Sequence, residues 1–290
     1  MPKNRFENPP RGAARSPMEG MAHLRRRIND LATLAMPARW GALSSIIREA
    51  FERREGDNLQ PQAISKAGAG SGFQGRARDV SPAVIAHAAR RGEFLRFVMG
   101  RACWFREDSL PARFIGARAV TRGPLTDAMK LALDGDFRVV VQQATRESIA
   151  AGRPFCPGDT GVAIFEAAHA AGFAHSLEIR GQSEELCAGL YGLAQGRGFI
   201  ILEIFASAPE LHRLALDSLE AQLAQWRYEV LAFSPYARMR EAMLAEAGFS
   251  AMLRTEFDNA CGANPSAGRH GRWSFEEKIS AARDPFSSAA

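Results

Sequence analysis

Residues 165–205 read FEAAHAAGFAHSLEIRGQSEELCAGLYGLAQGRGFIILEIF, and the rest of the chain is organised around them. Gly172 suits the C-cap of a helix, because a positive φ costs a glycine nothing. Residues 174–180 alternate small or apolar side chains with polar ones, as a half-buried strand does. Residues 199–205 are almost wholly apolar, which is typical of a strand buried on both faces. The stretch therefore predicts a helix that leads into a sheet with a central strand.

A further strand is expected between these two, over residues 186–194. Gly189 and Gly192 interrupt it, and a glycine within a strand lets another backbone or a ligand approach closely. A helix that is followed by a hairpin and then by a central strand forms an α+β core. The sequence thus predicts the α+β class.

The chain before this stretch is predicted to mix helices and strands. Ser81 and Pro82 open a helix that ends near Gly92, since serine is a good N-cap and proline suits the first turn. Aromatic residues are frequent in the segment 94–105, where core packing is their expected role. The other upstream elements are a helix at 125–133 ended by Asp134 and Gly135, a strand at 137–141, a helix capped by Thr145, and a helix at 160–171.

The chain after residue 205 is predicted to alternate helices with strands. Pro209 begins a long helix that runs to Trp226. Leu216, Leu219 and Leu223 fall on one face of it, so this helix is expected to pack on the sheet. The last predicted elements are a strand at 229–233, a helix at 237–247, a strand at 251–257 and a loose tail from Asp258.

The first 80 residues are basic. They carry 14 Lys and Arg against 8 Asp and Glu, while the net charge of the whole chain is +5. Residues 1–20 are rich in Pro, Gly, Arg and Asn and are expected to be disordered. Residues 21–34 and 40–54 read as short amphipathic helices, and residues 67–72 as a flexible linker. The run Arg25-Arg26-Arg27 can bind RNA phosphates, although such a run is more often a solvated charged surface.

Length and composition are those of a globular protein with one or two domains. The chain has 290 residues, of which 46% are hydrophobic, and is long enough for a large core. Its four cysteines show no C-x-x-C spacing, which argues against a zinc site and a disulfide framework. No apolar run approaches the roughly 20 residues that span a bilayer, and no apolar signal segment opens the chain. We expect a reduced, cytoplasmic protein without a bound metal.

The stretch 165–205 resembles the signature of the leucyl/phenylalanyl-tRNA–protein transferase family. That signature runs roughly Y-x-x-L-H-x-x-G-x-A-H-S-x-E, then M-Y-G-V-A-x-G, then F-x-G-E-S-M-F-S. A weaker match begins at Ser81 and runs through Phe94, and the similarity covers about residues 80–257. The matching residues are His169, Gly172, Ala174, His175, Ser176, Glu178, Tyr191, Gly192, Ala194, Gly196, Phe199 and Phe205.

The resemblance implies an acetyltransferase-like (GNAT) fold, which is a mixed sheet flanked by helices. The predicted order of strands and helices also fits that fold. The expected division is a basic, largely flexible extension with short helices at 1–79, a small N-terminal α/β lobe at 80–155, a GNAT-like transferase domain at 156–257 and a loose tail at 258–290.

The resemblance also implies a reaction. Family members move leucine or phenylalanine from its charged tRNA to a protein whose N-terminal residue is Lys or Arg. A neutral amine attacks an activated ester, so no cofactor is needed, and we expect a monomer that does not bind membranes. The implied substrate-binding residues are Leu190, Tyr191, Gly192, Phe199, Leu202, Phe205 and Ala232, and the implied tRNA-binding residues are Arg90, Arg91 and Arg213.

The polar residues of the family's site are replaced in this chain. Read without gaps, the family's glutamate falls on Leu202, and Glu203 follows one position later. The family's aspartate and glutamine on the next strand fall on Ala232 and Ser234, and an upstream tryptophan becomes Cys156. Glu203 and Ser234 are therefore the remaining candidate catalytic residues.

The direction of Glu203 separates two functions. Adjacent strand residues point to opposite faces, so Glu203 is expected to turn away from the pocket that Leu202 faces. Phe205 keeps the family's spacing, which argues against a β-bulge. An active transferase with altered polar groups and a non-catalytic module that binds RNA or peptide both stay open. A plain acetyltransferase is disfavoured, because residues 206–210 lack the pyrophosphate-binding loop.

Overall fold

The structure is a computed structural model that describes most of the chain after residue 71. The described residues are 72–98, 100–116, 129–153, 156–235, 237, 241–262, 268–269 and 271–275, with a few positions between 21 and 32. Those few positions are helical, in agreement with the helix predicted at 21–34. The predictions for residues 1–20, for the helix 40–54 and for most of the linker 67–72 lie outside the described residues.

The central feature is a mixed sheet of seven strands in the order β10-β4-β9-β8-β7-β6-β5. Only β8 and β9 run parallel, and the other neighbours are antiparallel. β8 is the predicted central strand, and it is buried along nearly its whole length. The strands are β4 (Ser109–Phe114), β5 (Lys130–Leu133), β6 (Ala174–Arg180), β7 (Leu186–Gln195), β8 (Gly198–Ala206), β9 (Val230–Phe233) and β10 (Ser250–Leu253).

A second sheet of three strands precedes the large one in the chain. Its order is β1-β3-β2, and the predicted aromatic segment 94–105 forms the β2–β3 hairpin. The helix α3 begins at Pro82 as predicted, and β4 and β5 from the segment 80–155 are part of the large sheet. The elements are β1 (Gly72–Arg76), α3 (Pro82–Arg90), β2 (Glu93–Val98) and β3 (Arg101–Arg106).

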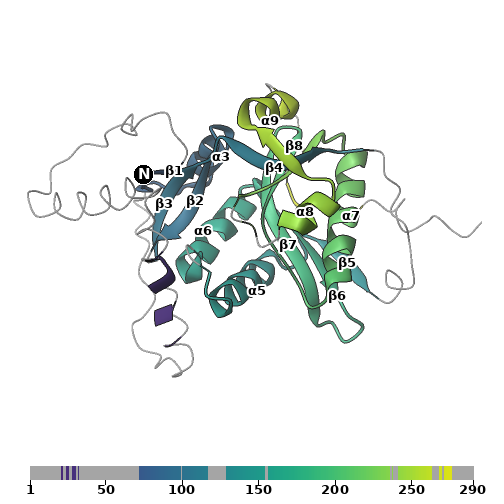
Figure 1. The fold of residues 1–290 in the computed structure, drawn as a ribbon. Coiled ribbons are helices and arrows are strands. Elements are labelled where there is room, and N and C mark those ends of the chain that lie inside the picture. Colours follow the sequence, from purple (N-terminus) through teal and green to yellow (C-terminus); the bar gives the residue numbers. More distant parts are fainter. Residues whose placement is uncertain are drawn as a thin grey trace, which may run out of the picture.

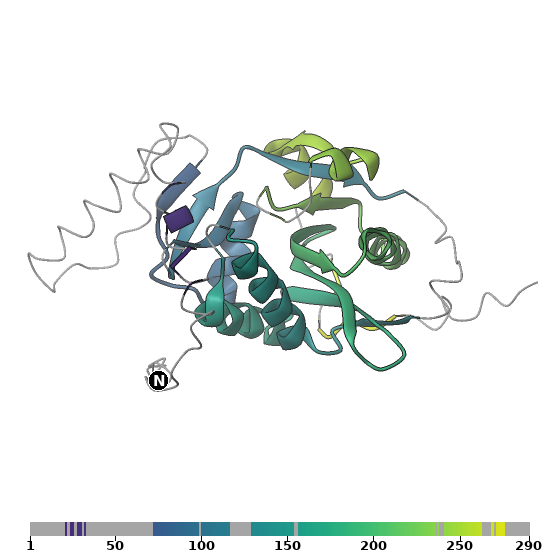
Figure 2. The ribbon, with the colours of Figure 1, turned by 60° about the horizontal axis from the view of Figure 1, so that its bottom comes forward.

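Helices cover both faces of the large sheet, which confirms the α+β class and the mixed sheet with flanking helices. Two helices pack on one face, here called the α5 face, and one long helix packs on the other, here called the α7 face (Figures 1 and 2). Each face has its own apolar cluster. The helices are α5 (Phe137–Ala150), α6 (Gly158–Ala170), α7 (Pro209–Gln225), α8 (Glu241–Glu246) and α9 (Arg254–Cys261).

Two predictions near residue 137 are wrong. The expected strand 137–141 is the first turn and a half of α5, and Thr145 lies buried inside that helix. Asp136 caps α5, because its carboxylate accepts a hydrogen bond from the Val139 N–H at 3.2 Å. Conversely, Lys130–Leu133 was expected to end a helix and is the strand β5, which pairs with β6. Packing and caps thus outweigh the weak strand preference of valine and phenylalanine.

Three further predictions about strands and the tail need correction. β6 is buried on both faces rather than half-buried. The strand expected at 251–257 ends at Leu253, and α9 begins at Arg254. The tail is not loose throughout, because α9 continues through Asp258 and the Trp273 side chain is 1% exposed. The segment around Trp273 is ordered because its indole is buried against the folded part of the chain.

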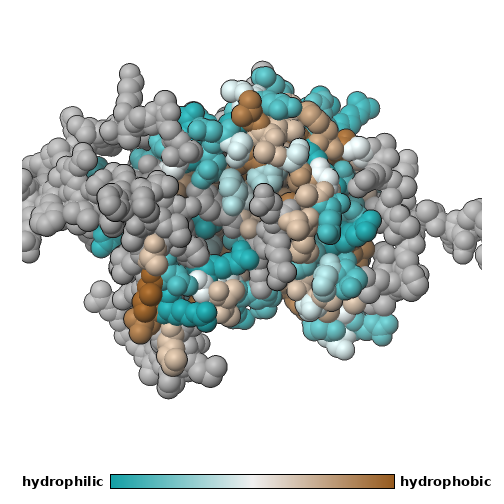
Figure 3. Space-filling view, in the orientation of Figure 1, coloured by the Kyte–Doolittle hydropathy of each residue, from teal (hydrophilic) through white to brown (hydrophobic). Residues whose placement is uncertain are grey.

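The described part of the N-terminal helix presents an apolar stripe to solvent. Met21, Leu24 and Ile28 are more than half exposed, and a brown patch marks this region at the lower left of Figure 3. The Asn29 side chain donates a hydrogen bond to the carbonyl of Gly152, just after α5. The helix therefore contacts the folded part of the chain while its apolar stripe faces outward.

Candidate active site

A β-bulge in β8 shapes the candidate site. In the β7–β8 ladder Gly192 lies opposite Ile201, whereas Tyr191 lies opposite Glu203. Leu202 is the extra residue between these two pairs, which is the arrangement of a β-bulge. Directly opposite residues share one face of a sheet, so Glu203 faces the same side as Tyr191. The prediction that Glu203 turns away from the face of Leu202 is wrong, because the bulge interrupts the alternation.

The sequence-predicted substrate residues lie on both faces of the sheet. Tyr191, Leu202, Phe205 and Ala232 belong to the apolar cluster of the α5 face. Leu190 and Phe199 belong to the cluster of the α7 face. A single cavity on one face therefore cannot bring all of them together.

Gly192 holds the bulged strand close to its neighbours rather than leaving room for a ligand. A Cβ at this position would lie 2.3 Å from the Ile200 carbonyl oxygen and 2.7 Å from two ring carbons of Phe199. Gly189 likewise lies against the Phe205 ring, where a Cβ would be 2.9 Å from a ring carbon. The two glycines of β7 thus accommodate the aromatic rings of β8.

We predict that Gly192→Ala destabilises the protein by about 1–3 kcal/mol, because the methyl group overpacks a site with no free volume. Urea denaturation followed by circular dichroism measures the change. Gly116→Ala is the matched control, since a Cβ there would meet no atom within 4 Å. Equal stability of the two variants would contradict the close packing around Gly192.

The pairing of β8 with β9, which separates the α5 face from the α7 face, ends partway along β8. Their parallel pairing ends at Ile201 and Phe233, and the Ser234 N–H donates a last hydrogen bond to the Ile201 carbonyl at 2.8 Å. Beyond this point the described strands pair with the remainder of β8 only on the β7 side. Ser234 therefore lies beside the bulged Leu202, two residues after Ala232. Past this break no β8–β9 ladder separates the side chains of the two faces among the described residues.

Tyr191 is the centre of a small polar group within the α5 face. Burial raises the pKa of Tyr191 well above its ordinary value, and the nearby Glu203 carboxylate raises it further. The charge of Arg96 on β2 acts in the opposite direction, and Cys156 contributes a smaller rise. The Tyr191 hydroxyl therefore keeps its proton at physiological pH and is available as a hydrogen-bond donor.

Aromatic rings pack around Tyr191, and both Tyr191 and Glu203 are shielded from solvent. The Phe165 ring lies 5.5 Å from the Tyr191 ring, and the Phe137 ring lies 6.1 Å from it, nearly edge-on. Glu203 itself is 7% exposed. Sequence reasoning missed Arg96, although a charged residue within the aromatic segment 94–105 was a signal that it has a buried partner.

The family-signature residue His175 belongs to a buried hydrogen-bonded hub around Asp134. The Asp134 carboxylate accepts hydrogen bonds from His175 Nδ1 at 2.8 Å, from the Ser176 N–H at 2.8 Å and from the Trp273 N–H at 2.7 Å. Burial lowers the pKa of His175, and the hydrogen bond to Asp134 partly offsets that effect. His175 is therefore neutral at physiological pH, with its Nδ1 proton directed to Asp134.

The same hub contains three possible metal ligands. Asp134, His169 and His175 could offer ligand atoms that lie within 4.8 Å of one another. However, both oxygens of Asp134 already accept N–H groups, and His169 Nδ1 lies 2.8 Å from the Ala174 carbonyl oxygen. The Asp134 oxygens and His169 Nδ1 thus already have hydrogen-bond partners, which does not favour a cation, while the buried His175 Nε2 has no hydrogen-bond partner among the described residues.

Two of the predicted tRNA-binding residues, Arg91 and Arg213, lie on different parts of the fold. Arg91 is exposed at the turn before β2 and pairs with Glu93 at 2.8 Å. Arg213 is exposed on α7, over the opposite face of the sheet, and lies 3.6 Å from Asp217. The side chain of Arg90 lies outside the described part. Their role in tRNA binding stays a prediction.

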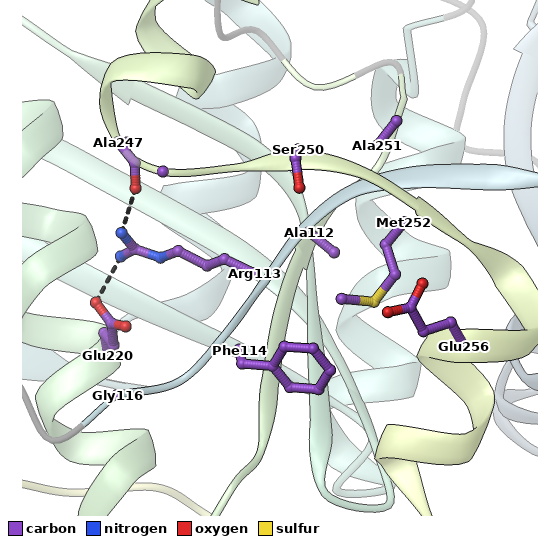
Figure 4. Close-up of a pocket in the computed structure, with 11 residues that line it drawn as sticks. Ala112, Arg113, Phe114, Gly116, Glu220, Ala247, Ser250, Ala251, Met252 and Glu256 are labelled. Atoms are coloured by element: carbon purple, nitrogen blue, oxygen red, sulfur yellow. Dashed lines mark hydrogen bonds and ion pairs between the residues drawn. The ribbon is translucent and has the colours of Figure 1, made fainter.

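A pocket of about 460 Å³ lies at the β4–β10 edge of the sheet. Its wall includes Arg113, which pairs with Glu220 at 2.5 Å and donates to the Ala247 carbonyl (Figure 4). Phe114 and Met252 also line it. Glu220 neutralises Arg113, and none of the sequence-predicted site residues lines this pocket. We therefore do not choose it as the candidate site.

None of the described helices is long and apolar enough to cross a membrane.

Comparison with known proteins identifies the family of the chain. Residues 110–262 match the family model described as leucyl/phenylalanyl-tRNA protein transferase. A protein of that name from Nitrosomonas europaea is 29% identical over 210 residues, which cover 68% of this chain and 84% of the relative. A second, from Saccharophagus degradans, is 27% identical over 207 residues, covering 70% and 83%. The matched region contains the bulged strand pair together with Asp134 and His175 of the hub, and the chain belongs to the leucyl/phenylalanyl-tRNA protein transferase family.

Proposed function

We propose that the protein transfers leucine or phenylalanine from aminoacyl-tRNA to the N-terminus of an acceptor protein that begins with Lys or Arg. Family membership supports the reaction class. The observation that carries activity in this divergent chain is the pairing of Tyr191 with Glu203 across the bulge. The bulge directs a carboxylate to the face of Leu202, the position at which the resemblance places the family's glutamate.

The reaction needs a proton acceptor near the attacking amine. The α-amine of the acceptor attacks the ester carbonyl, the new amide bond forms, and the bond between the carbonyl carbon and the ribose oxygen of the tRNA breaks. The amine loses a proton, and the ribose oxygen gains one. Glu203 is suited to orient the amine and take up its proton, while Tyr191 is suited to donate a hydrogen bond. Ser234 offers a further hydroxyl at the end of the β8–β9 pairing.

The two faces of the sheet have different roles in this proposal. Leu190 and Phe199, in the apolar cluster of the α7 face, are assigned to the leucine or phenylalanine side chain. Both are fully buried, so the transferred side chain reaches them by displacing neighbouring apolar groups. Tyr191 and Glu203 on the α5 face act on the reacting groups. The ester is assigned to the end of the β8–β9 pairing at Ser234, because no β8–β9 ladder separates the two faces beyond that point among the described residues.

Purified full-length protein, radiolabelled Leu-tRNA or Phe-tRNA, and a peptide that begins with Arg test the proposal. Label should appear in the Arg peptide and not in the same peptide with an acetylated N-terminus. Binding of the charged tRNA without any transfer would contradict the proposal and favour a binding module.

A further inference from the structure

Trp273 is held in the core although it lies beyond the part of the chain that matches the family model, residues 110–262. Its backbone N–H donates to Asp134 at 2.7 Å, and its indole Nε1–H donates to the Arg269 carbonyl at 3.2 Å. Its ring stacks on His175 with the ring centres 3.8 Å apart and the planes 4° from parallel. Position and tilt of the indole are therefore both defined.

The fixed indole lies against Phe199 on the α7 face. The two ring centres are 5.3 Å apart, and the planes are inclined by 41°. The Phe199 ring also lies over Gly192, where even a Cβ would be 2.7 Å from ring carbons. His175, on which the Trp273 indole stacks, is directly opposite Gly192 in the β6–β7 ladder. The Phe199 ring is thus confined between the sheet backbone and Trp273.

We propose that Trp273 is a positioning residue that fixes the Phe199 ring and so sets which apolar side chain the transferase accepts. The inference rests on the proposed function, in which Phe199 contacts the transferred amino acid. While the indole is in place, the Phe199 ring has a single position. The apolar site that Phe199 forms with Leu190 then has a single shape. With a smaller residue at 273, Phe199 can move toward the vacated volume, and the site then has more room for an aromatic side chain than for leucine.

The test compares two charged tRNAs on variants of the full-length protein. Trp273→Leu removes most of the support, and Trp273→Phe removes part of it. The measured quantity is the ratio of kcat/KM for Phe-tRNA to that for Leu-tRNA with one acceptor peptide. We expect Trp273→Leu to raise this ratio by about tenfold, the size of effect that small volume changes have in apolar pockets. Trp273→Phe should raise it less.

Trp226→Phe is the matched control. Trp226 lies just after α7 with its ring 5.0 Å from that of Trp273, and its truncation leaves the contact between Trp273 and Phe199 in place. The control should keep the wild-type ratio. A purely structural role of Trp273 lowers the rates for both tRNAs together, and an unchanged ratio in Trp273→Leu and Trp273→Phe would overturn the proposal.

A second readout separates this inference from the proposed function. Leu-tRNA and Phe-tRNA in which an amide replaces the ester cannot react, and their dissociation constants are measured on the same variants. If the wild-type protein transfers neither amino acid, the proposed function fails, while the ratio of these constants still tests Trp273. A ratio that shifts toward phenylalanine supports the positioning role, and an unchanged ratio overturns it.

Discussion

Glu203→Gln is expected to lower kcat/KM for transfer by about 10²–10⁴-fold, the usual contribution of a positioned acid or base. Glutamine has nearly the same shape as glutamate but cannot accept the amine proton. The bulge at Leu202 is the reason for expecting so large an effect, because it directs the carboxylate toward Tyr191. Steady-state kinetics with Phe-tRNA and an Arg peptide measure the loss.

Two further variants make this result specific. Glu229→Gln applies the same chemical change to a half-exposed carboxylate, which pairs with Arg197 at 2.5 Å, and should leave kcat unchanged. Leu202→Glu restores a carboxylate at the neighbouring position of the bulge, and in the Glu203→Gln background it should recover part of the rate. Transfer by Glu203→Gln at the wild-type rate would show that Glu203 is not the proton acceptor.

Asp134→Ala is expected to destabilise the protein by at least about 3 kcal/mol, because each buried donor left without an acceptor costs about 1–3 kcal/mol. The donors are the main-chain N–H groups of Ser176 and Trp273 and the imidazole of His175. All three are buried, so water cannot replace the carboxylate. Urea denaturation monitored by circular dichroism measures the free energy of unfolding.

Asp136→Ala is the control for the loss of a neighbouring carboxylate. Asp136 is exposed and caps α5 through one hydrogen bond, so its replacement should cost about 1 kcal/mol. Near-ultraviolet circular dichroism adds a local readout, since Asp134→Ala should release Trp273 from its stack on His175. If the two variants lose the same small amount of stability, the hub around Asp134 does not hold the C-terminal segment.

Several elements could be predicted from the sequence because their signals are local. Gly172 ends α6 with a φ of +78°, as the C-cap argument required. The apolar run 199–205 is the buried β8, and Pro209 begins α7. Local signals failed at Phe137–Val141, where strand-favouring side chains lie in a helix. The Asp136 cap and the apolar packing of α5 stabilise that helix more than residue preference opposes it.

By itself, the sequence determined the α+β class, the order of most elements after residue 157 and the family, because periodicity, caps and motif spacing are properties of neighbouring residues. Only the tertiary structure decided the two features on which function depends. The bulge at Leu202 arises in the pairing of β7 with β8, and it turned Glu203 toward Tyr191 against strand alternation. The burial of Trp273 arises from Asp134 and His175, which are distant in sequence. Register and long-range packing depend on which segments meet in space, and no local pattern carries that information.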